Sequence, residues 1–478
     1  MKRCVKGILL CCLLCGVVSC SQGGNKKPAG TVVLPRAGLV HENMEGFTGK
    51  EISYALYIPV INHKTAVTGA DGKNGSGPSV SSMPIMVFFD PHGSGLLPVR
   101  KYKELADRYG FILLGSNNSK NGLSTSAIRD ILGPMFREIV SIYPIDTSRI
   151  YMTGFSGGSR VAATAALMTH LVRGVIGCGA GLPGDIDPSG FRADYFGIVG
   201  TADFNMNEML QLDEPMNRAG IRHFITTFPG PHGWPPVETM EQGFQWITLN
   251  AMRDGALPVD RELTGRIMEG FGKRVEEAVQ ENHLLAAAGF CREAISFAGR
   301  LTSSEHFESR LAEIEQLAAY KQQLSYRTAL LKDEAAEQQV LGTSIVTRDL
   351  AWWKNRVGLM DSRHMKGKNP EDTLMNARLQ AFLSLACYSY ANGAINQQRY
   401  QEAEKFVSLY ETADPPNPEA NYMQAILLVN RGEEAAAMAQ LKVAISKGFS
   451  DKQRLLRQPE LQPLKSSPSW NDILKTMK

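Results

Sequence analysis

A serine flanked by glycines is the first residue combination in this chain that could do chemistry. The stretch YMTGFSGGSR, residues 151–160, places Gly154, Ser156 and Gly158 in the pattern G-x-S-x-G. A chain with 45 glycines can satisfy this pattern by chance, so the motif alone does not make Ser156 a nucleophile. A serine hydroxyl reacts poorly unless a base takes its proton and a third group orients that base. The neighbouring elements must therefore supply a base and an acid.

The segments on either side of Ser156 predict a sharp turn. RIYMTGF before it is a short apolar run typical of a buried strand, and SRVAATAALM after it is an Ala-rich run typical of a helix. A serine between such elements has an exposed hydroxyl and needs small neighbours, because the turn leaves no room for side chains. The helix N-terminus also brings partial positive charge to the place where an oxyanion would form.

Two further strand ends supply the partners. YFGIVGTAD ends a predicted strand at Asp203, and the next predicted strand, in IRHFITTFPGPHGWPP, is followed by His232. The carboxyl ends of parallel strands share one edge of a sheet, and hydrolases of this architecture carry their triad in the order serine, acid, histidine. We therefore predict Ser156 as nucleophile, His232 as general base and Asp203 as the acid that orients it.

The same edge offers candidates for oxyanion and substrate contacts. FFDPHGSG follows another predicted strand, and we expect the N–H groups of Gly157 and Ser94 to form an oxyanion hole, with the N–H of Gly95 as the alternative to that of Ser94. Trp234, beside the predicted base, either walls the substrate pocket or simply packs. Asn117 and Asn118 in GSNNSKNG either line the cleft or stabilise a turn.

The alternation of elements predicts the fold class. Residues 45–255 alternate strand and helix patterns, which indicates an α/β domain with a doubly wound, mostly parallel sheet. Residues 260–478 have helical periodicity and predict an all-α domain. A shift of 34 residues within 380–449 places Ala391 on Ala425 and Ala403 on Ala437. This period loosely resembles the tetratricopeptide repeat, so we expect a repeat-like helical domain that could bind a protein partner.

The N-terminus predicts export. Residues 1–20 join basic residues to a short apolar run that ends in VVSC, which resembles a bacterial lipoprotein signal with Cys20 as the lipidated residue. A plain secretory signal or a short anchor is the alternative. The polar residues 21–44 are expected to form a flexible tether. The expected location is the cell envelope, at the outer membrane or facing the periplasm, with membrane attachment through the lipid.

Composition limits the remaining function classes. The chain has 478 residues, enough for two or three domains, and a net charge of +3, which gives no reason to expect a nucleic-acid partner. Five of the eight cysteines precede residue 21, and the other three (Cys178, Cys291, Cys387) are far apart in apolar runs. Without metal-ligand spacing these three are expected to be buried free thiols, and no metal or other cofactor is predicted.

Four motifs together resemble a known family. HGSG, GFSGGSR, GTAD and GPHGWP make residues 45–250 similar to secreted α/β-hydrolase esterases, namely polyhydroxybutyrate depolymerases, feruloyl esterases and acetylxylan esterases, with dienelactone hydrolases nearby. The resemblance implies the triad and oxyanion donors given above. It also implies a cofactor-free serine esterase for small or polymer-borne esters, such as acetyl or feruloyl groups on a polysaccharide. The aspartate in FFDPHG departs from the family pattern.

Spacing and architecture leave two rival functions. Only 47 positions separate Ser156 from Asp203, which leaves little room for an inserted lid and predicts an open cleft. The same triad serves peptidases of the prolyl-oligopeptidase type, so a serine peptidase is one rival. The other is an interaction protein whose helical repeats bind a partner while the hydrolase part is only a scaffold. A third reading combines an active esterase with a docking domain.

Overall fold

The computed structural model describes residues 35–46, 52–60, 82–184, 187–366 and 369–477. Residues 36–478 form one compact unit. The predicted signal segment, Cys20 and most of the predicted tether lie outside the described residues. Within the described ranges, no helix combines the length and apolar character needed to cross a membrane.

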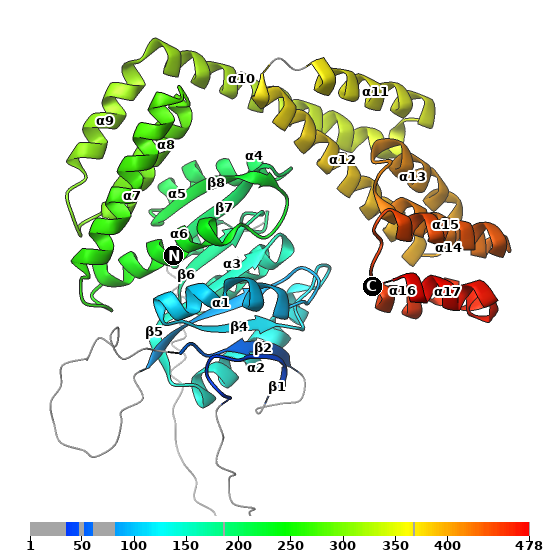
Figure 1. The fold of residues 1–478 in the computed structure, drawn as a ribbon, viewed down its shortest axis with the longest axis horizontal. Coiled ribbons are helices and arrows are strands. Elements are labelled where there is room, and N and C mark those ends of the chain that lie inside the picture. The colour runs from blue at the N-terminus through cyan, green and yellow to red at the C-terminus, as the bar shows by residue number, and fades with distance from the viewer. Residues whose placement is uncertain (1–34, 47–51, 61–81, 185–186, 367–368, 478) are drawn as a thin grey trace, which may run out of the picture. The chain divides into compact units, whose positions relative to one another are not determined.

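Eight strands form one sheet in the order β1-β2-β4-β3-β5-β6-β7-β8 (Figure 1). β1 pairs with β2 and β2 with β4 in antiparallel fashion, and all later neighbours are parallel. The strands are β1 (Val40–Glu45), β2 (Ser53–Tyr57), β3 (Met83–Phe89), β4 (Ile112–Ser116), β5 (Ile145–Phe155), β6 (Val172–Cys178), β7 (Asp194–Ala202) and β8 (His223–Pro231). The sheet therefore begins at Val40, inside the segment predicted as tether.

Helices alternate with these strands and then continue alone. Those of the sheet region are α1 (Leu96–Tyr109), α2 (Thr125–Ile142), α3 (Gly157–Met168), the 3₁₀ turn η1 (Pro188–Gly190), α4 (Met206–Leu210), α5 (Asp213–Arg218) and α6 (Val237–Arg253). The α2 helix begins after Ser124, whose side chain accepts a hydrogen bond from Ala127 N–H at 3.2 Å and so caps it.

The helical region follows α6 without a strand among its described residues. Its helices are α7 (Arg261–Gln280), α8 (Leu284–Ala298), α9 (Glu305–Gln316), α10 (Ala318–Thr347), α11 (Leu350–Lys366), α12 (Pro370–Asn396), α13 (Tyr400–Ala413), α14 (Pro418–Asn430), α15 (Glu434–Ser446), α16 (Lys452–Arg457), η2 (Pro459–Ser466) and α17 (Pro468–Thr476). The predicted fold class, a doubly wound and mostly parallel α/β-hydrolase sheet followed by an all-α region, is confirmed.

Both faces of the sheet are covered. Along β3, Met86 and Phe88 pack with α1 and α6 on one face, and Val87 and Phe89 pack with α2 and α3 on the other. This alternation follows from the two-residue period of a strand. Because both faces are buried, the parallel strands carry continuous apolar runs rather than alternating ones.

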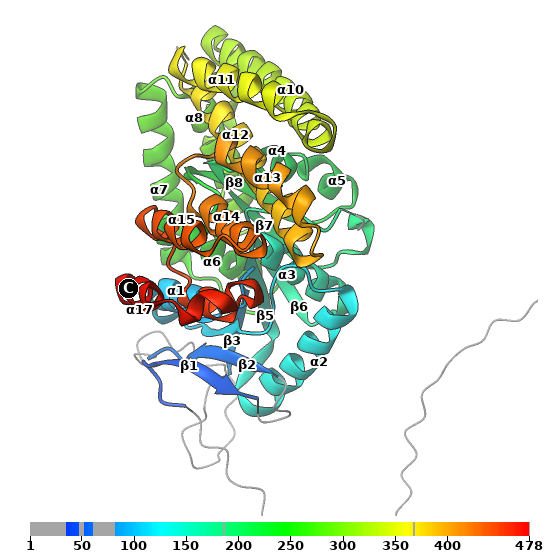
Figure 2. The ribbon, with the colours of Figure 1, turned by 90° about the vertical axis from the view of Figure 1, so that its right-hand side faces the viewer.

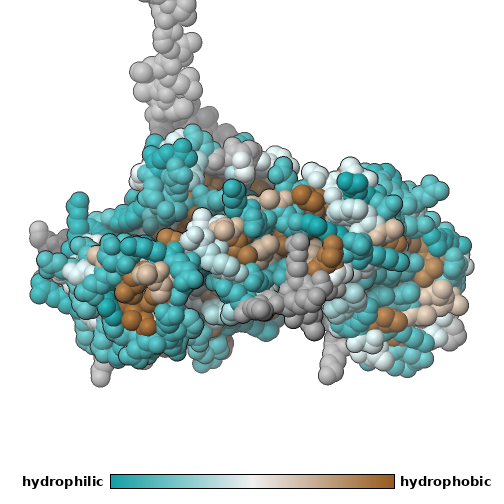
Figure 3. Space-filling view, turned by 90° about the horizontal axis from the view of Figure 1, so that it is seen from above, coloured by the Kyte–Doolittle hydropathy of each residue, from teal (hydrophilic) through white to brown (hydrophobic). Residues whose placement is uncertain are grey.

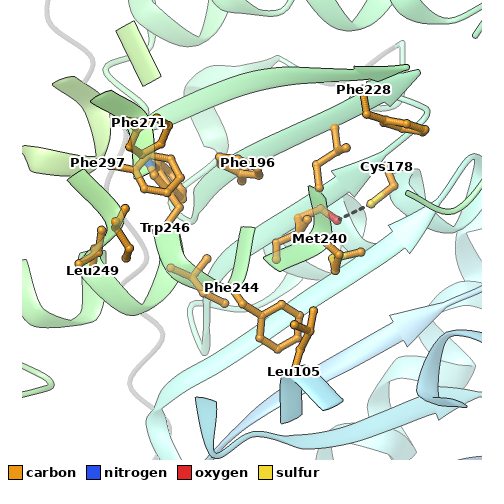
Figure 4. Packing of buried hydrophobic residues seen from close by; sticks show 14 of the residues in the cluster. Leu105, Cys178, Phe196, Phe228, Met240, Phe244, Trp246, Leu249, Phe271 and Phe297 are labelled. Carbon is orange, nitrogen blue, oxygen red and sulfur yellow. Dashed lines mark hydrogen bonds between the residues drawn. The ribbon is translucent and has the colours of Figure 1, made fainter. Parts of the chain in front are cut away.

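The core on the α6 face extends into the helical region (Figure 4). Trp246 of α6 packs against Phe196 of β7, with ring centroids 5.5 Å apart. Phe297 of α8 lies 6.1 Å from Phe196 and 4.9 Å from Phe271 of α7. The sheet region and α7–α8 therefore share one hydrophobic core, although the sequence changes character near residue 255.

The segment with the 34-residue period forms two helical hairpins. α12 packs on α13 and α14 on α15, and the helices of each pair lie side by side in both ribbon views (Figures 1 and 2). Ala391, Ala403, Ala425 and Ala437 are all completely buried. The small residues lie where the helices approach each other, as the period predicts. Assignment to the tetratricopeptide family stays a prediction.

The surface and the thiols agree with the composition. The face drawn in Figure 3 is mostly hydrophilic, with separate small hydrophobic patches. Cys178, Cys291 and Cys387 are free and buried, as predicted.

Candidate active site

Ser156 lies on the turn that its sequence context predicts. It follows β5 directly and is the N-cap of α3, with φ 54° and ψ −122°. Positive φ is costly for a residue with a side chain, by about 1–3 kcal/mol, and such strain collects at functional sites. The turn is anchored because Ser156 N–H donates to Cys178 O at 2.8 Å.

The glycines around Ser156 are required by close backbone approaches. A Cβ on Gly154 would collide with the carbonyl of Gly158, and a Cβ on Gly158 would collide with the carbonyl of Phe89 at the end of β3. The G-x-S-x-G pattern therefore lets strand, helix and neighbouring strand meet at one point, which presents the Ser156 hydroxyl at the edge of the sheet.

Asp203 and His232 form the pair predicted from their strand ends. His232 Nδ1 lies 2.8 Å from Asp203 Oδ2, and the Asp203 side chain is 1% exposed. The other Asp203 oxygen accepts the Asn205 N–H at 2.9 Å. The amide of Asn205 in turn donates to Gly179 O at 2.7 Å. This bonding fixes the acid and leaves Nε2 of His232 as the nitrogen available for proton transfer.

Two aromatic rings hold the imidazole from either side. The His232 ring centroid lies 4.5 Å from that of Phe155, the residue before Ser156, and 4.3 Å from that of Phe204, the residue after Asp203. These contacts bring the histidine to the serine turn. Among the described residues, no hydrogen bond joins Ser156 to His232. Such bonds are often long before substrate binds.

The loop expected to supply the second oxyanion donor is organised around Asp90. This buried carboxylate accepts the His92 N–H at 2.9 Å, the Ser94 N–H at 3.4 Å and the Trp234 indole N–H at 2.9 Å. Burial raises the pKa of Asp90, but the hydrogen bonds from His92 and Trp234 outweigh it, and the pKa ends below its ordinary value. The Ser94 N–H is thus directed at Asp90, and its predicted oxyanion role finds no support in the described contacts.

A different residue, Asn121, lies against the predicted Gly157 donor. A Cβ on Gly157 would collide with the Asn121 side-chain amide. The Gly157 N–H belongs to the first turn of α3, where helical N–H groups have no acceptor within the helix. Ser156, Gly157, Asn121 and Phe204 line one cavity of about 460 Å³, which we call the serine cavity. Sequence reasoning missed Asn121, although it belongs to the same GSNNSKNG motif as two predicted residues.

The three residues predicted to contact substrate, Trp234, Asn117 and Asn118, make other contacts in the structure. Trp234 packs against Phe88, Tyr102 and Phe155 with centroid distances of 5.8–6.1 Å, so packing explains this residue. The Asn117 amide donates to Asn43 Oδ1 at 3.3 Å, and Asn118 Oδ1 accepts the N–H of Ser53 at 2.7 Å. These asparagines tie the end of β4 to β1 and β2, and the cleft prediction for them is not supported.

The short Ser156–Asp203 spacing predicts an open cleft, and the helical region contributes a wall to it. A second cavity, of about 600 Å³, is lined by His232 together with residues of α12 and α13 and of the turn after α13. Leu385 of α12 lines both this cavity and the serine cavity. The spacing excludes a lid inserted between the triad residues. It does not exclude cover from helices that follow the catalytic region in the chain.

The helical region also holds the loop that carries Asp203. Arg378 Nη1 of α12 donates to Thr201 O at 2.6 Å, two residues before the acid. The Arg378 guanidinium forms a fully buried ion pair with Glu334 of α10, at 2.6 Å from Nη2 to Oε2. Gln338 of α10 donates to Phe204 O at 3.3 Å. The backbone on both sides of Asp203 is therefore hydrogen-bonded to helices α10 and α12.

Comparison with known proteins gives resemblance in structure only. No protein-family model matches the sequence, and no curated protein matches it. An S-formylglutathione hydrolase of Staphylococcus aureus is 12% identical, with a TM-score of 0.34, over 45% of this chain and 99% of the other. An esterase of Pyrobaculum calidifontis is 14% identical, with a TM-score of 0.34, over 46% and 87%.

A peptidase of known structure has a similar sequence identity and TM-score to this chain. An acylaminoacyl peptidase of Pyrococcus horikoshii is 13% identical, with a TM-score of 0.32, over 45% of this chain and 41% of the other. At these identities and TM-scores, the function has to be inferred from the geometry of the chain's own site.

Proposed function

We propose that the chain is a serine hydrolase that cleaves carboxylic esters through an acyl-enzyme. The observation that carries this proposal is the strained Ser156 turn beside a histidine that is hydrogen-bonded to a buried aspartate. A strained non-glycine residue, a buried acid and an oriented imidazole at one sheet edge are the parts of acyl-transfer chemistry. None of them is needed by a mere scaffold.

The proposed mechanism uses these side chains in two steps. His232 Nε2 takes the proton as Ser156 Oγ attacks the ester carbonyl, and the imidazolium is stabilised by Asp203 across the 2.8 Å contact. His232 then gives the proton to the leaving alcohol, and water hydrolyses the acyl-enzyme by the same route. The oxyanion is held by the Gly157 N–H and, we propose, by Nδ2 of Asn121, since the amide group of this residue lies against Gly157.

Covalent labelling tests the proposal directly. A fluorophosphonate probe should label the wild type and fail to label Ser156→Ala, which should also lose hydrolysis of p-nitrophenyl acetate. Ser94→Ala is the matched control, because it removes a hydroxyl near the site and keeps the backbone. Equal labelling of Ser156→Ala and the wild type would contradict the assignment of Ser156 as the nucleophile. A p-nitroanilide with the same acyl group as the ester separates esterase from peptidase, since a peptidase should cleave both.

The cellular setting rests on the sequence alone. We propose lipid attachment at Cys20 and a location in the cell envelope, because residues 1–20 resemble a lipoprotein signal. Cys20→Ala should release the protein from the membrane fraction and abolish incorporation of a labelled fatty acid. Membrane retention of this variant would contradict lipid attachment at that residue. Acetyl or feruloyl groups on a polysaccharide remain candidate substrates, which a panel of such esters would test.

A further inference from the structure

The cavity shared by His232 and the helical region has a marked chemical character. Its volume is about 600 Å³, and we call it the α12–α13 cavity. In addition to His232, the polar or aromatic residues that line it include Ser384, Tyr388, Tyr410, Asp414 and Asn417. Two tyrosine side chains and one carboxylate, that of Asp414, therefore line this cavity.

The Asp414 carboxylate is fixed in place by neutral groups. Its Oδ2 accepts hydrogen bonds from the Ser384 hydroxyl at 2.7 Å and from the Asn417 amide at 2.8 Å. These donors orient the carboxylate without neutralising it. No ion pair to Asp414 occurs within the described part of the chain. The carboxylate is only half-buried, so a positively charged group that enters the cavity can reach it.

The nearby cations are committed to other partners. Arg454, which lies close enough to influence Tyr388, forms a two-point pair with Glu419, with Nη1 2.8 Å and 2.9 Å from its carboxylate oxygens. Lys447 donates to Pro415 O at 2.7 Å and to Asn421 Oδ1 at 2.6 Å. Neither of these two cations forms an ion pair with Asp414.

The residue types indicate what that ligand is. Aromatic faces attract cations, and a tyrosine pair beside a carboxylate suits an ammonium group, above all a quaternary one that cannot donate hydrogen bonds. We infer that the α12–α13 cavity binds a positively charged amine carried by the substrate. This inference deepens the proposed function and rests on it as far as the substrate is concerned.

The position of His232 assigns the amine to one side of the ester. The general acid delivers its proton to the leaving alcohol, so the alcohol must lie on the histidine side of the scissile bond. The α12–α13 cavity contains His232, whereas the serine cavity contains Ser156 and Gly157. The amine is therefore part of the alcohol, and the substrate class is the carboxylic ester of an amino alcohol.

A pair of isosteric esters tests the inference. Acetylcholine and 3,3-dimethylbutyl acetate have the same shape, and only the first carries a charge. The wild type should favour acetylcholine in kcat/KM by about tenfold, and Asp414→Asn should bring this ratio close to one. Glu411→Gln is the control, because it removes a charge from the last turn of α13, three residues before Asp414, at a position outside the cavity lining.

A binding measurement keeps this test separate from the proposed function. Tetramethylammonium should bind the Ser156→Ala protein in calorimetry, and the additional change Asp414→Asn should abolish the heat. Tyr388→Leu gives a second variant that leaves the Ser384 and Asn417 hydrogen bonds intact, and it should weaken binding. Neutral-ester hydrolysis with no preference for acetylcholine would overturn the cation site alone. Absence of tetramethylammonium binding would also overturn it, whatever the turnover.

Discussion

His232 Nδ1 and Asp203 Oδ2 lie 2.8 Å apart although the two residues come from the ends of different strands, β8 and β7. The acid is almost completely buried, and the imidazole is held between Phe155 and Phe204. This arrangement fixes which ring nitrogen carries the proton before substrate arrives. The pair is thus oriented for general-base catalysis.

Removing the acid should cost turnover rather than stability. In Asp203→Asn the side chain keeps its shape, but the imidazole loses its tautomer control and the charge that stabilises the imidazolium. We expect kcat for p-nitrophenyl acetate to fall roughly 10³–10⁴-fold with unchanged circular dichroism. A second histidine–aspartate pair, His223 with Asp213 at 3.2 Å, offers the control. Asp213→Asn should leave kcat unchanged, and similar losses in both variants would argue against a special role for Asp203.

The Asn121 amide should contribute to the oxyanion site. Asn121→Ala removes a polar group that lies against Gly157 in the serine cavity, so kcat should fall about 10²-fold while KM changes little. Asn117→Ala is the matched control, because that amide is bonded to Asn43 outside the two cavities. Steady-state kinetics on both variants checks this. A change in KM alone would assign Asn121 to substrate binding instead.

Arg378 should act as a positioning residue for the Asp203 loop. Arg378→Met leaves the buried Glu334 carboxylate unpaired, which should lower the free energy of unfolding by about 3–5 kcal/mol. It also frees the Thr201 carbonyl, so kcat should fall roughly tenfold or more through misplacement of the acid. Urea denaturation and kinetics at low temperature give the two quantities.

A double variant separates positioning from stability. Arg378→Met with Glu334→Leu removes both charges and should recover most of the stability, while kcat stays low because Thr201 O still lacks its donor. Full recovery of kcat would show that the pair matters for stability only. Arg431→Met disrupts an exposed pair with Glu404 and should change the free energy of unfolding by less than about 1 kcal/mol.

The free energy of unfolding should depend on pH through the titration of Glu293. Burial raises the pKa of this α8 carboxyl to about 7 from an ordinary 4.5, although Arg274 partly offsets the effect. A raised pKa means that the folded state holds the proton more tightly. The contribution to stability is therefore complete below pH 4.5 and is lost as the pH rises to 7.

Replacement by glutamine should remove this dependence. Glu293→Gln should be more stable than the wild type above pH 7, by roughly 2–3 kcal/mol, and similar to it below pH 4.5. Urea denaturation at pH 4.5 and pH 8 measures the difference. The exposed Glu277 of the neighbouring α7 is the control, since Glu277→Gln should shift stability little at either pH. A parallel loss at both pH values would contradict the titration of Glu293.

The sequence predicts well what local pattern and strand order determine. Ser156 lies at a turn because an apolar strand is followed by an Ala-rich helix, and Asp203 and His232 meet because parallel strands end at one edge. Asn121 and Arg378 could not be found in the same way. Asn121, in the loop after β4, lies against Gly157 at the start of α3. Arg378 donates a hydrogen bond to Thr201 O, which is 177 positions away in the chain. Such contacts depend on tertiary packing and leave no periodic signal.

The lack of support for Ser94 as an oxyanion donor has a similar cause. The motif HGSG suggests Ser94 as an oxyanion donor. However, β3 ends at Phe89, and the carboxylate of the next residue, Asp90, accepts hydrogen bonds from the N–H groups of His92 and Ser94. The aspartate departs from the pattern of the esterases that the motifs resemble, and this departure is the signal in the sequence that the loop is organised differently. What the carboxylate accepts can be read only from the folded chain.

The hydrogen bond from Arg378 to Thr201 has a consequence for how the molecule is made. Synthesis reaches the triad residues long before it reaches α12, so a nascent chain can hold its serine, acid and base while the acid loop still lacks its outer support. The loop that carries Asp203 gains this hydrogen bond only when α12 has folded against it. The helical region would thus set how well the acid is aligned in the proposed hydrolase, because the donor to Thr201 O comes from α12.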